Sequence, residues 1–177
     1  MSVLRSRWLQ PVWLVARVWL GIQWLEAGWH KVLDPKWMVT GEAVQGYWMR
    51  VAGLLPDAKP MIKYGWYHSF ITWMTENGHH VFMGKLVAVG EVLVGVGLIL
   101  GIFTVAAAFF GALMNLNYML CGTTSSNPVL YTLSILIMIA GPAAYYWGGD
   151  RFVLPYVSRL LSRIRKTRRT RTASAQA

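Results

Sequence analysis

The sequence predicts an all-α integral membrane protein, built as a four-helix bundle with two interfacial helices in its first outer loop. Of the 177 residues, 55% are hydrophobic and only 14% are charged, whereas soluble domains usually carry about 25% charged residues. Four stretches are apolar enough and long enough, or nearly so, to cross a bilayer. The ten Trp residues are typical of chains that meet membrane–water interfaces.

The net charge of +10 belongs mainly to the C-terminal part of the chain. Residues 151–177 hold eight Lys or Arg residues and no acidic residue, so residues 156–177 form a basic tail. Beside a spanning helix, such a tail fixes topology or binds anionic membrane lipids, and we do not expect nucleic acid as a partner. Together with Arg5 and Arg7, it predicts a multi-pass protein of the cell membrane with both termini in the cytoplasm.

The predicted domain, residues 1–155, contains spans at about 11–29, 81–101, 104–120 and 128–147. We interpret the first as a retained helix, because it is longer than the apolar core of a signal peptide and carries internal charges. Only residues 101–103 separate the second and third spans, which predicts an antiparallel hairpin. A polar turn over 122–127 leads to the fourth span, where Pro128 lies in the first turn and its missing N–H costs nothing.

The outer loop, residues 30–80, contains two amphipathic segments, at 42–55 and 64–74. Each is too short and too polar to span a bilayer, so both are predicted as helices that lie in the interface. They are either a lid or docking surface for a redox partner protein, or an aromatic collar that only seats the bundle.

Small residues and ionisable residues share faces on the first two spans. Ionisable side chains inside a membrane are functional candidates by default, and small residues let two helix backbones approach closely. At 100° per residue, one stripe of the first span and one of the second collect these positions. The stripes are Arg17, Gly21, Trp24, Gly28 and Lys31 in the first span, and Gly84, Ala88, Glu91, Gly95 and Leu98 in the second.

Depths measured from the helix ends predict a cluster of Arg17, Glu91 and Asn115 inside the bundle. At 1.5 Å per residue, Arg17 lies roughly 9 Å from the cytoplasmic end, and Glu91 and Asn115 each roughly 16 Å. A long Arg side chain covers much of that difference. The alternative interpretation is a buried ion pair that only sets helix register.

A second group lies nearer the outer face. Glu26 and His30 fall at roughly 22 Å or deeper, on the face opposite Arg17, and Lys85 at roughly 25 Å, which suggests a Glu26–Lys85 pair. With Lys31 and Trp24, these side chains offer donors for the carbonyl oxygens of a quinone or a route for protons. The alternative is ordinary snorkelling of charged side chains at the interface.

Other chemistries have little support. Cys121 is the only cysteine, so neither an intrachain disulfide nor a CxxC motif is present, and we expect its thiol to be inert. No Cys/His cluster has zinc-site spacing. His79 and His80 point about 100° apart on a helix, so no metal is expected there. Phosphate-binding loops and nucleophile-elbow motifs are absent.

Several motifs resemble the DoxX family of small four-helix membrane proteins. They are the RVWLG and GWHK runs in residues 17–31, the run from Lys85 through Gly90-Glu91 to Thr104, and Asn115-Leu116-Asn117 followed by residues 123–128. Asn115-Leu116-Asn117 and the motif in residues 123–128 also resemble the branch that holds the DoxD-type subunit of thiosulfate:quinone oxidoreductase. The resemblance covers residues 11–155 and implies functional marks at Arg17, Gly21, Gly28, Lys31 and Glu91.

The resemblance implies a membrane subunit of a redox assembly with quinone as cofactor. One branch implies oxidation of thiosulfate by quinone, and another implies complexes that handle thiol and oxidative stress. Two other classes stay open: a non-catalytic anchor that gathers redox partners through residues 30–80, and a small transporter, which would need a homo-oligomer because four short helices leave little room for a path.

Overall fold

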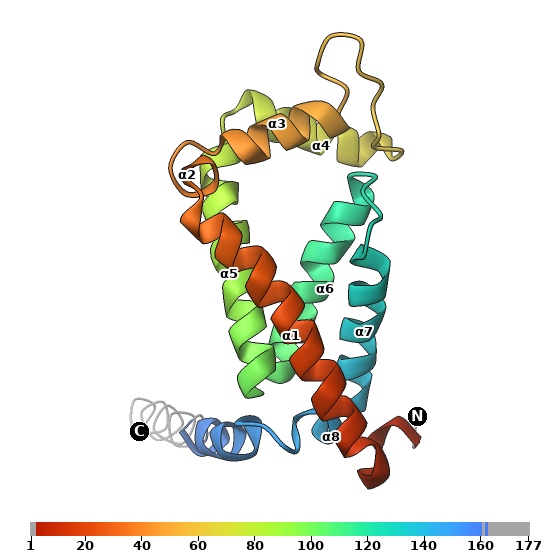
Figure 1. Cartoon of the computed structure of the whole chain (residues 1–177), viewed down its shortest axis with the longest axis vertical. Helices are drawn as coiled ribbons and strands as arrows, with labels where there is room; N and C mark the ends of the chain where they lie inside the picture. The colour runs from red at the N-terminus through yellow and green to blue at the C-terminus, as the bar shows by residue number, and fades with distance from the viewer. Residues whose placement is uncertain (1–2, 161, 163–177) are drawn as a thin grey trace, which may run out of the picture.

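The computed structural model describes residues 3–160 and 162, and within them the fold is all-α without strands, which confirms the predicted class. Four long helices, α1, α5, α6 and α7, run along the length of the molecule, and two shorter ones, α3 and α4, lie across one end (Figure 1). Their bounds are α1 Gln10–Leu33, α3 Glu42–Val51, α4 Gly65–Glu76, α5 His80–Leu100, α6 Thr104–Leu120 and α7 Asn127–Ala140. Minor elements are η1 (Val3–Arg5), η2 (Arg7–Leu9), α2 (Pro35–Met38) and α8 (Pro142–Tyr145).

Helices α1 and α5 form the tightest pair, and glycines determine where they touch. A Cβ atom at Gly28 would lie 2.7 Å from the backbone nitrogen of Val92, and one at Gly95 would lie 2.6 Å from that of Leu25. Only glycine therefore lets the two backbones come this close. The buried faces of both helices include the small-residue positions predicted from the sequence, and these contacts set the register of the pair.

The predicted hairpin between α5 and α6 is present, and a residue outside the hairpin, Asp150, stabilises its turn. Gly101 ends α5 with φ of 65°, a conformation that favours glycine, and Phe103 follows with φ of 51°. The carboxylate of Asp150 accepts hydrogen bonds from the backbone N–H of Phe103 at 2.6 Å and of Thr104 at 2.8 Å. Asp150, 1% exposed, thus caps the N-terminus of α6 from a distant part of the chain.

The fourth predicted span ends earlier as a regular helix than the sequence suggested. Helix α7 stops at Ala140, and Gly141 turns the chain with φ of 52° and ψ of −119° before Pro142 begins the short helix α8. A proline cannot continue the hydrogen-bonding pattern of the preceding helix. Residues 150–160 are again helical and lie at the end of the bundle opposite α3 and α4 (Figure 1). Most of the predicted basic tail lies outside the described residues.

The two predicted interfacial helices form a layer with its own small core. Helix α3 lies within the predicted segment 42–55, and α4 begins and ends close to 64–74. Their buried side chains, with Cys121 at the end of α6, form a cluster separate from the bundle core. The members are Val44, Trp48, Val51, Ala52, Ile62, Tyr67, Ile71, Met74 and Cys121. The layer therefore covers the ends of α5 and α6.

By length and composition, one helix of the described chain, α5, is able to cross a membrane. Helices α6 and α7 are apolar but have 17 and 14 residues, fewer than the usual span of about 20. Helix α1 has 24 residues, but Arg17, Glu26 and Lys31 lower its hydropathy. The four-span arrangement stays a prediction.

Candidate functional site

A polar cavity of about 690 Å³ lies between α1 and the α6–α7 pair, beneath α3. We call it the polar cavity. It is lined by Gln23, Trp24, Glu26, Ala27, His30, Lys31, Trp37, Ala43, Tyr47, Glu91, Asn115, Tyr118, Ser126, Asn127 and Leu130. Six of the eight predicted site residues are among them, and Arg17 and Lys85 are not.

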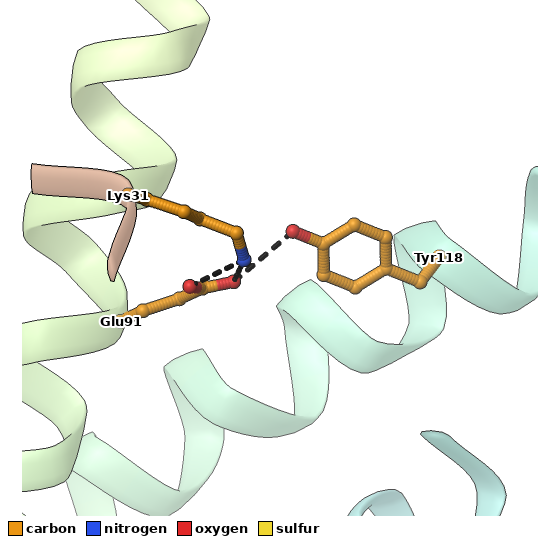
Figure 2. Close-up of polar contacts among 3 residues, drawn as sticks. All are labelled: Lys31, Glu91 and Tyr118. Atoms are coloured by element: carbon orange, nitrogen blue, oxygen red, sulfur yellow. Dashed lines mark hydrogen bonds and ion pairs between the residues drawn. The ribbon is translucent and has the colours of Figure 1, made fainter. Parts of the chain in front are cut away.

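A buried ion pair stands at the centre of this cavity. The Nζ atom of Lys31 lies 2.5 and 2.6 Å from the two carboxylate oxygens of Glu91, and the Tyr118 hydroxyl donates to Oε1 of Glu91 at 3.0 Å. Figure 2 shows the three side chains converging from α1, α5 and α6. Glu91 is 1% exposed and Lys31 19%, so the carboxylate is almost closed off while the ammonium still reaches the cavity.

Aromatic rings surround the ammonium group of Lys31. It lies 4.9 Å from the centroid of the Trp37 ring and 5.7 Å from that of Tyr118. Such contacts stabilise a cation when water is largely excluded. The positive charge is thus held by one carboxylate and two ring faces, on a side chain from the last turn of α1.

The predicted cluster of Arg17, Glu91 and Asn115 is wrong in its choice of cation. A Cβ atom at Gly28 would lie 2.9 Å from the Cβ atom of Glu91, so Glu91 is level with Gly28. Arg17 is eleven residues earlier, about 16 Å along the helix axis. The error arose because depths were measured from the helix ends, whereas the glycine contacts set the register.

Arg17 instead contacts backbone carbonyl groups at the C-terminal end of α5. Its guanidinium donates to the carbonyl oxygens of Leu98 at 2.5 Å and of Ile99 at 3.4 Å. These carbonyls have no partner within the last turn of a helix, and a cation there also interacts favourably with the helix dipole. Arg17, 1% exposed, therefore stabilises the α5–α6 hairpin, close to the Asp150 cap.

Two buried polar side chains of the cavity lack a protein partner. Within the described part of the chain, neither amide atom of Asn115 nor the indole Nε1 of Trp24 has a hydrogen-bond partner. Asn115 is 0% exposed and Trp24 3%. Gly111 leaves room for the indole, since a Cβ atom there would lie 3.0 Å from its Nε1. Buried polar groups are normally satisfied, so two such groups on one cavity indicate a missing ligand or water.

The outer group of predicted residues is divided by the structure. Glu26 and His30 line the cavity from exposed positions on α1 and form its rim. Lys85 is exposed on α5 and does not line the cavity, so the predicted Glu26–Lys85 pair is wrong. Within residues 3–160, the only ion pair is Lys31–Glu91. Lys85 and Glu91 are six residues apart, and the helical step turns the lysine away from the bundle.

Sequence reasoning missed three aromatic residues of the site: Tyr118, Tyr47 and Trp37. Tyr118 follows Asn115 by three residues on α6, so helical spacing alone would have placed both on one face. Tyr47 and Trp37 come from the outer layer, and no local pattern connects them to the ion pair. Burial raises the pKa of the Tyr47 hydroxyl and keeps it protonated, although its hydrogen bond with Thr123 at 3.0 Å acts in the opposite direction.

The same three aromatic residues also line a second, apolar cavity of about 490 Å³. We call it the apolar cavity. Its other walls are mainly hydrophobic faces of α3, α4, α5 and α6, and their further polar groups belong to Trp48, Tyr67, Asn117 and Cys121. It contains no charged side chain. A polar chamber and an apolar chamber therefore meet at Trp37, Tyr47 and Tyr118.

The polar cavity has the chemistry to hold an uncharged, oxygen-bearing group. The ammonium of Lys31 and the indole N–H of Trp24 donate, and the Asn115 amide both donates and accepts. Glu91 and Lys31 balance each other's charge in the interior of the cavity. Glu26 and His30 form its exposed rim, so a further carboxylate lies at the entrance.

Comparison with known proteins identifies the family. Searches of the curated proteins and of the solved structures found no match. A sequence model of the DoxX family matches residues 12–123, which include all of α1 to α6 except the first two residues of α1. The match covers more than half of the chain and contains Lys31, Glu91, Asn115 and Tyr118. The chain therefore belongs to the DoxX family of membrane-associated proteins.

Proposed function

We propose that this protein is a multi-pass membrane subunit of a quinone-linked redox complex, and that the polar cavity holds the quinone ring. Membership of the DoxX family makes it membrane-associated, and some members of that family are linked to quinone-related oxidoreductases. The observation that carries the proposal is the cavity itself, where a buried Lys31–Glu91 pair faces the unpartnered polar atoms of Asn115 and Trp24.

Four membrane-crossing helices are supported by the outer faces of the bundle. Large apolar side chains there are uncovered by protein, including Val15 at 68%, Leu93 at 65% and Phe110 at 55% exposure. Continuous apolar surface of this kind marks contact with lipid or with another protein. Helices α6 and α7 would reach across the bilayer with the help of the flanking turns and of local thinning.

The residues of the polar cavity fit a quinone ring. A quinone presents two carbonyl oxygens, which need hydrogen-bond donors, and it has a flat apolar ring. Trp24 and Asn115 offer unused N–H groups, and Lys31 offers a third donor at a nearby wall. When bound, a quinone supplies two-electron chemistry coupled to two protons.

The chain's own residues supply binding and proton handling. The Asn115 amide and the Trp24 indole orient the ring through hydrogen bonds. Lys31 Nζ and the Tyr118 hydroxyl hold protons beside it, while Glu91 fixes both groups in place. Glu26 and His30 at the rim connect this interior to the outer side. The electron donor is proposed to be thiosulfate or a thiol, delivered by a partner protein that docks on the outer layer.

Titration of a tailless benzoquinone into the protein in lipid nanodiscs tests the proposal. We expect saturable binding, and we expect Asn115→Leu to weaken it about tenfold, since it removes one or two hydrogen bonds. The matched control is Lys85→Gln, an exposed position on α5 outside the cavity, which should stay within about twofold of the wild type. Absence of binding, or equal affinity of the Asn115→Leu and wild-type proteins, would refute the proposal.

Activity is tested in membranes that contain the protein together with its redox partner proteins. Thiosulfate-dependent reduction of a decyl-tailed benzoquinone, followed by its absorbance, should fall with Glu91→Gln and with His30→Ala and should be unchanged with Lys85→Gln. Reduction driven by a small thiol and not by thiosulfate would assign the protein to the thiol-linked branch. Activity that is indifferent to Glu91 and His30 would refute their proposed roles.

A non-catalytic scaffold is the second candidate, and one surface favours it. On α4, Trp66, Phe70 and Trp73 are 66%, 43% and 52% exposed and project from the outer layer. Such aromatic surface suits docking to a partner protein. Under this alternative, Trp66→Ser with Trp73→Ser should abolish co-purification of the partner, and Asn115→Leu should have no effect on any quinone-dependent rate.

A further inference from the structure

We infer that the apolar cavity binds the hydrocarbon tail of the quinone whose ring lies in the polar cavity. The inference rests on the proposed function and extends it, because it selects tailed, membrane-resident quinones over soluble ones. Three observations support it: the wall that the two cavities share, the chemistry of the apolar walls, and the position of the opening.

The two cavities lie on either side of a shared wall. Trp37, Tyr47 and Tyr118 line both of them. The Tyr118 hydroxyl faces Glu91 in the polar cavity, while the same side chain bounds the apolar one. A ring beside Lys31 would therefore place an attached chain next to these aromatic side chains, which also border the apolar cavity.

The walls of the apolar cavity suit a hydrocarbon chain and little else. They carry no charge, and their main polar groups are already engaged. The Tyr67 hydroxyl donates to Oδ1 of Asn117 at 3.0 Å, and the Cys121 thiol lies 3.7 Å from the Tyr67 oxygen. None of the fully buried side-chain atoms that lack a partner among the described residues belongs to the lining of this cavity. A ligand with hydrogen-bonding groups would lose its hydration there without compensation.

The cavity opens toward the faces of α5 and α6 that would meet lipid. Of its lining residues, Leu86, Leu93, Phe110 and Leu113 are 53%, 65%, 55% and 44% exposed. They are the same kind of apolar surface that covers the rest of the bundle. These exposed side chains would let a hydrocarbon tail enter the apolar cavity from the bilayer core.

Gly90 provides a specific means of blocking the tail. It lines the apolar cavity, and a Cβ atom there would meet only Met114 Sδ, at 3.7 Å, an ordinary contact. Gly90→Phe therefore fills the cavity while leaving the backbone and the polar cavity in place. Leu113→Trp, from the facing helix, is a second block at a position that is already exposed. Val89→Phe adds similar bulk to the exposed face of α5 outside both cavities and serves as the control.

The test compares a tailless benzoquinone with the same ring bearing a decyl tail, each titrated into wild type and variants in identical nanodiscs. Because each ligand is compared between variants, its partitioning into lipid cancels. Gly90→Phe and Leu113→Trp should weaken binding of the tailed quinone about tenfold, the typical cost of overfilling a packed site, and leave the tailless one within about twofold. Val89→Phe should change neither.

The possible failures are distinguishable. If the wild type binds neither ligand, the proposed function fails and the tail site fails with it. If the wild type binds both ligands but both blocking variants leave the affinity for the tailed quinone unchanged, the tail site is overturned and the ring site stands. Equal weakening of both ligands by both blocks also overturns the tail site. A photoreactive group at the tail end should label α5 and α6 in the wild type, and labelling of α7 instead would contradict the inference.

Discussion

The Lys31–Glu91 pair allows a quantitative test of how the site is held together. Glu91 is 1% exposed and Lys31 19%. Lys31→Met leaves the carboxylate buried with the Tyr118 hydroxyl as its remaining donor. Removing one partner of a buried pair costs about 3 to 5 kcal/mol, whereas replacing both by apolar groups is often neutral. Because Lys31 is partly exposed, we expect about 3 kcal/mol for Lys31→Met.

The reverse substitution should be milder. Glu91→Met leaves an ammonium group that already reaches the cavity and contacts the ring of Trp37, so we expect a cost of about 1 to 2 kcal/mol. The double variant Lys31→Met with Glu91→Met should lie within about 1 kcal/mol of the wild type. The resulting coupling energy is about 3 to 5 kcal/mol in size, well above the value expected for independent sites.

Reversible unfolding in mixed micelles by increasing SDS, followed by circular dichroism, measures these free energies. The control is Lys85→Met, an exposed lysine on the same helix as Glu91, which should change stability by no more than about 0.5 kcal/mol. If the Lys31 and Glu91 effects are additive to within about 0.5 kcal/mol, the two side chains do not interact as the structure has them, and the reasoning fails.

Three further predictions concern packing, capping and the thiol. Gly95→Ala should destabilise the protein by about 2 kcal/mol in SDS titrations, because its Cβ atom would lie 2.6 Å from the backbone of Leu25. Gly46→Ala, which meets nothing within 4 Å on α3, should stabilise it by about 0.5 kcal/mol, and equal effects would contradict the assigned register. Asp150→Ala removes two hydrogen bonds at the start of α6 and should lower the free energy of unfolding by about 1 to 2 kcal/mol. It should also speed proteolysis at residues 101–103, and unchanged cleavage would contradict the cap. Burial raises the pKa of the Cys121 thiol, so less thiolate is present at a given pH. Maleimide labelling of the folded protein should therefore be at least about tenfold slower than labelling in SDS. The labelling rate of the folded protein should also still rise with pH where the rate in SDS has levelled off. Equal rates in both states would show that the thiol is accessible.

Much of the fold was predictable because it depends on local patterns. Helical spacing placed Gly28 and Gly95 on the faces that pack together, and the short connection over residues 101–103 implied the hairpin. The sequence also placed Lys31 and Glu91 on the small-residue stripes of the first two spans, and in the structure these two side chains pair.

The choice of partners among the ionisable residues could not be predicted in the same way. Approximate depth favoured Arg17 as the partner of Glu91 and Lys85 as the partner of Glu26. In the structure Lys31 pairs with Glu91, because the glycine contacts fix the register of α1 against α5 so that Glu91 is level with Gly28. Arg17 is left beside the last turn of α5, where it contacts carbonyl groups instead.

The sequence by itself determined which residues form helices and which faces are apolar or small, since these properties follow from the chemistry of neighbours three and four positions apart. Only the tertiary structure decided that Tyr118 and Trp37 contact the ion pair and that these two residues and Tyr47 form the wall between a polar chamber and an apolar one. Those residues come from three helices, and their meeting depends on how backbones pack at a distance in sequence, which no local pattern records.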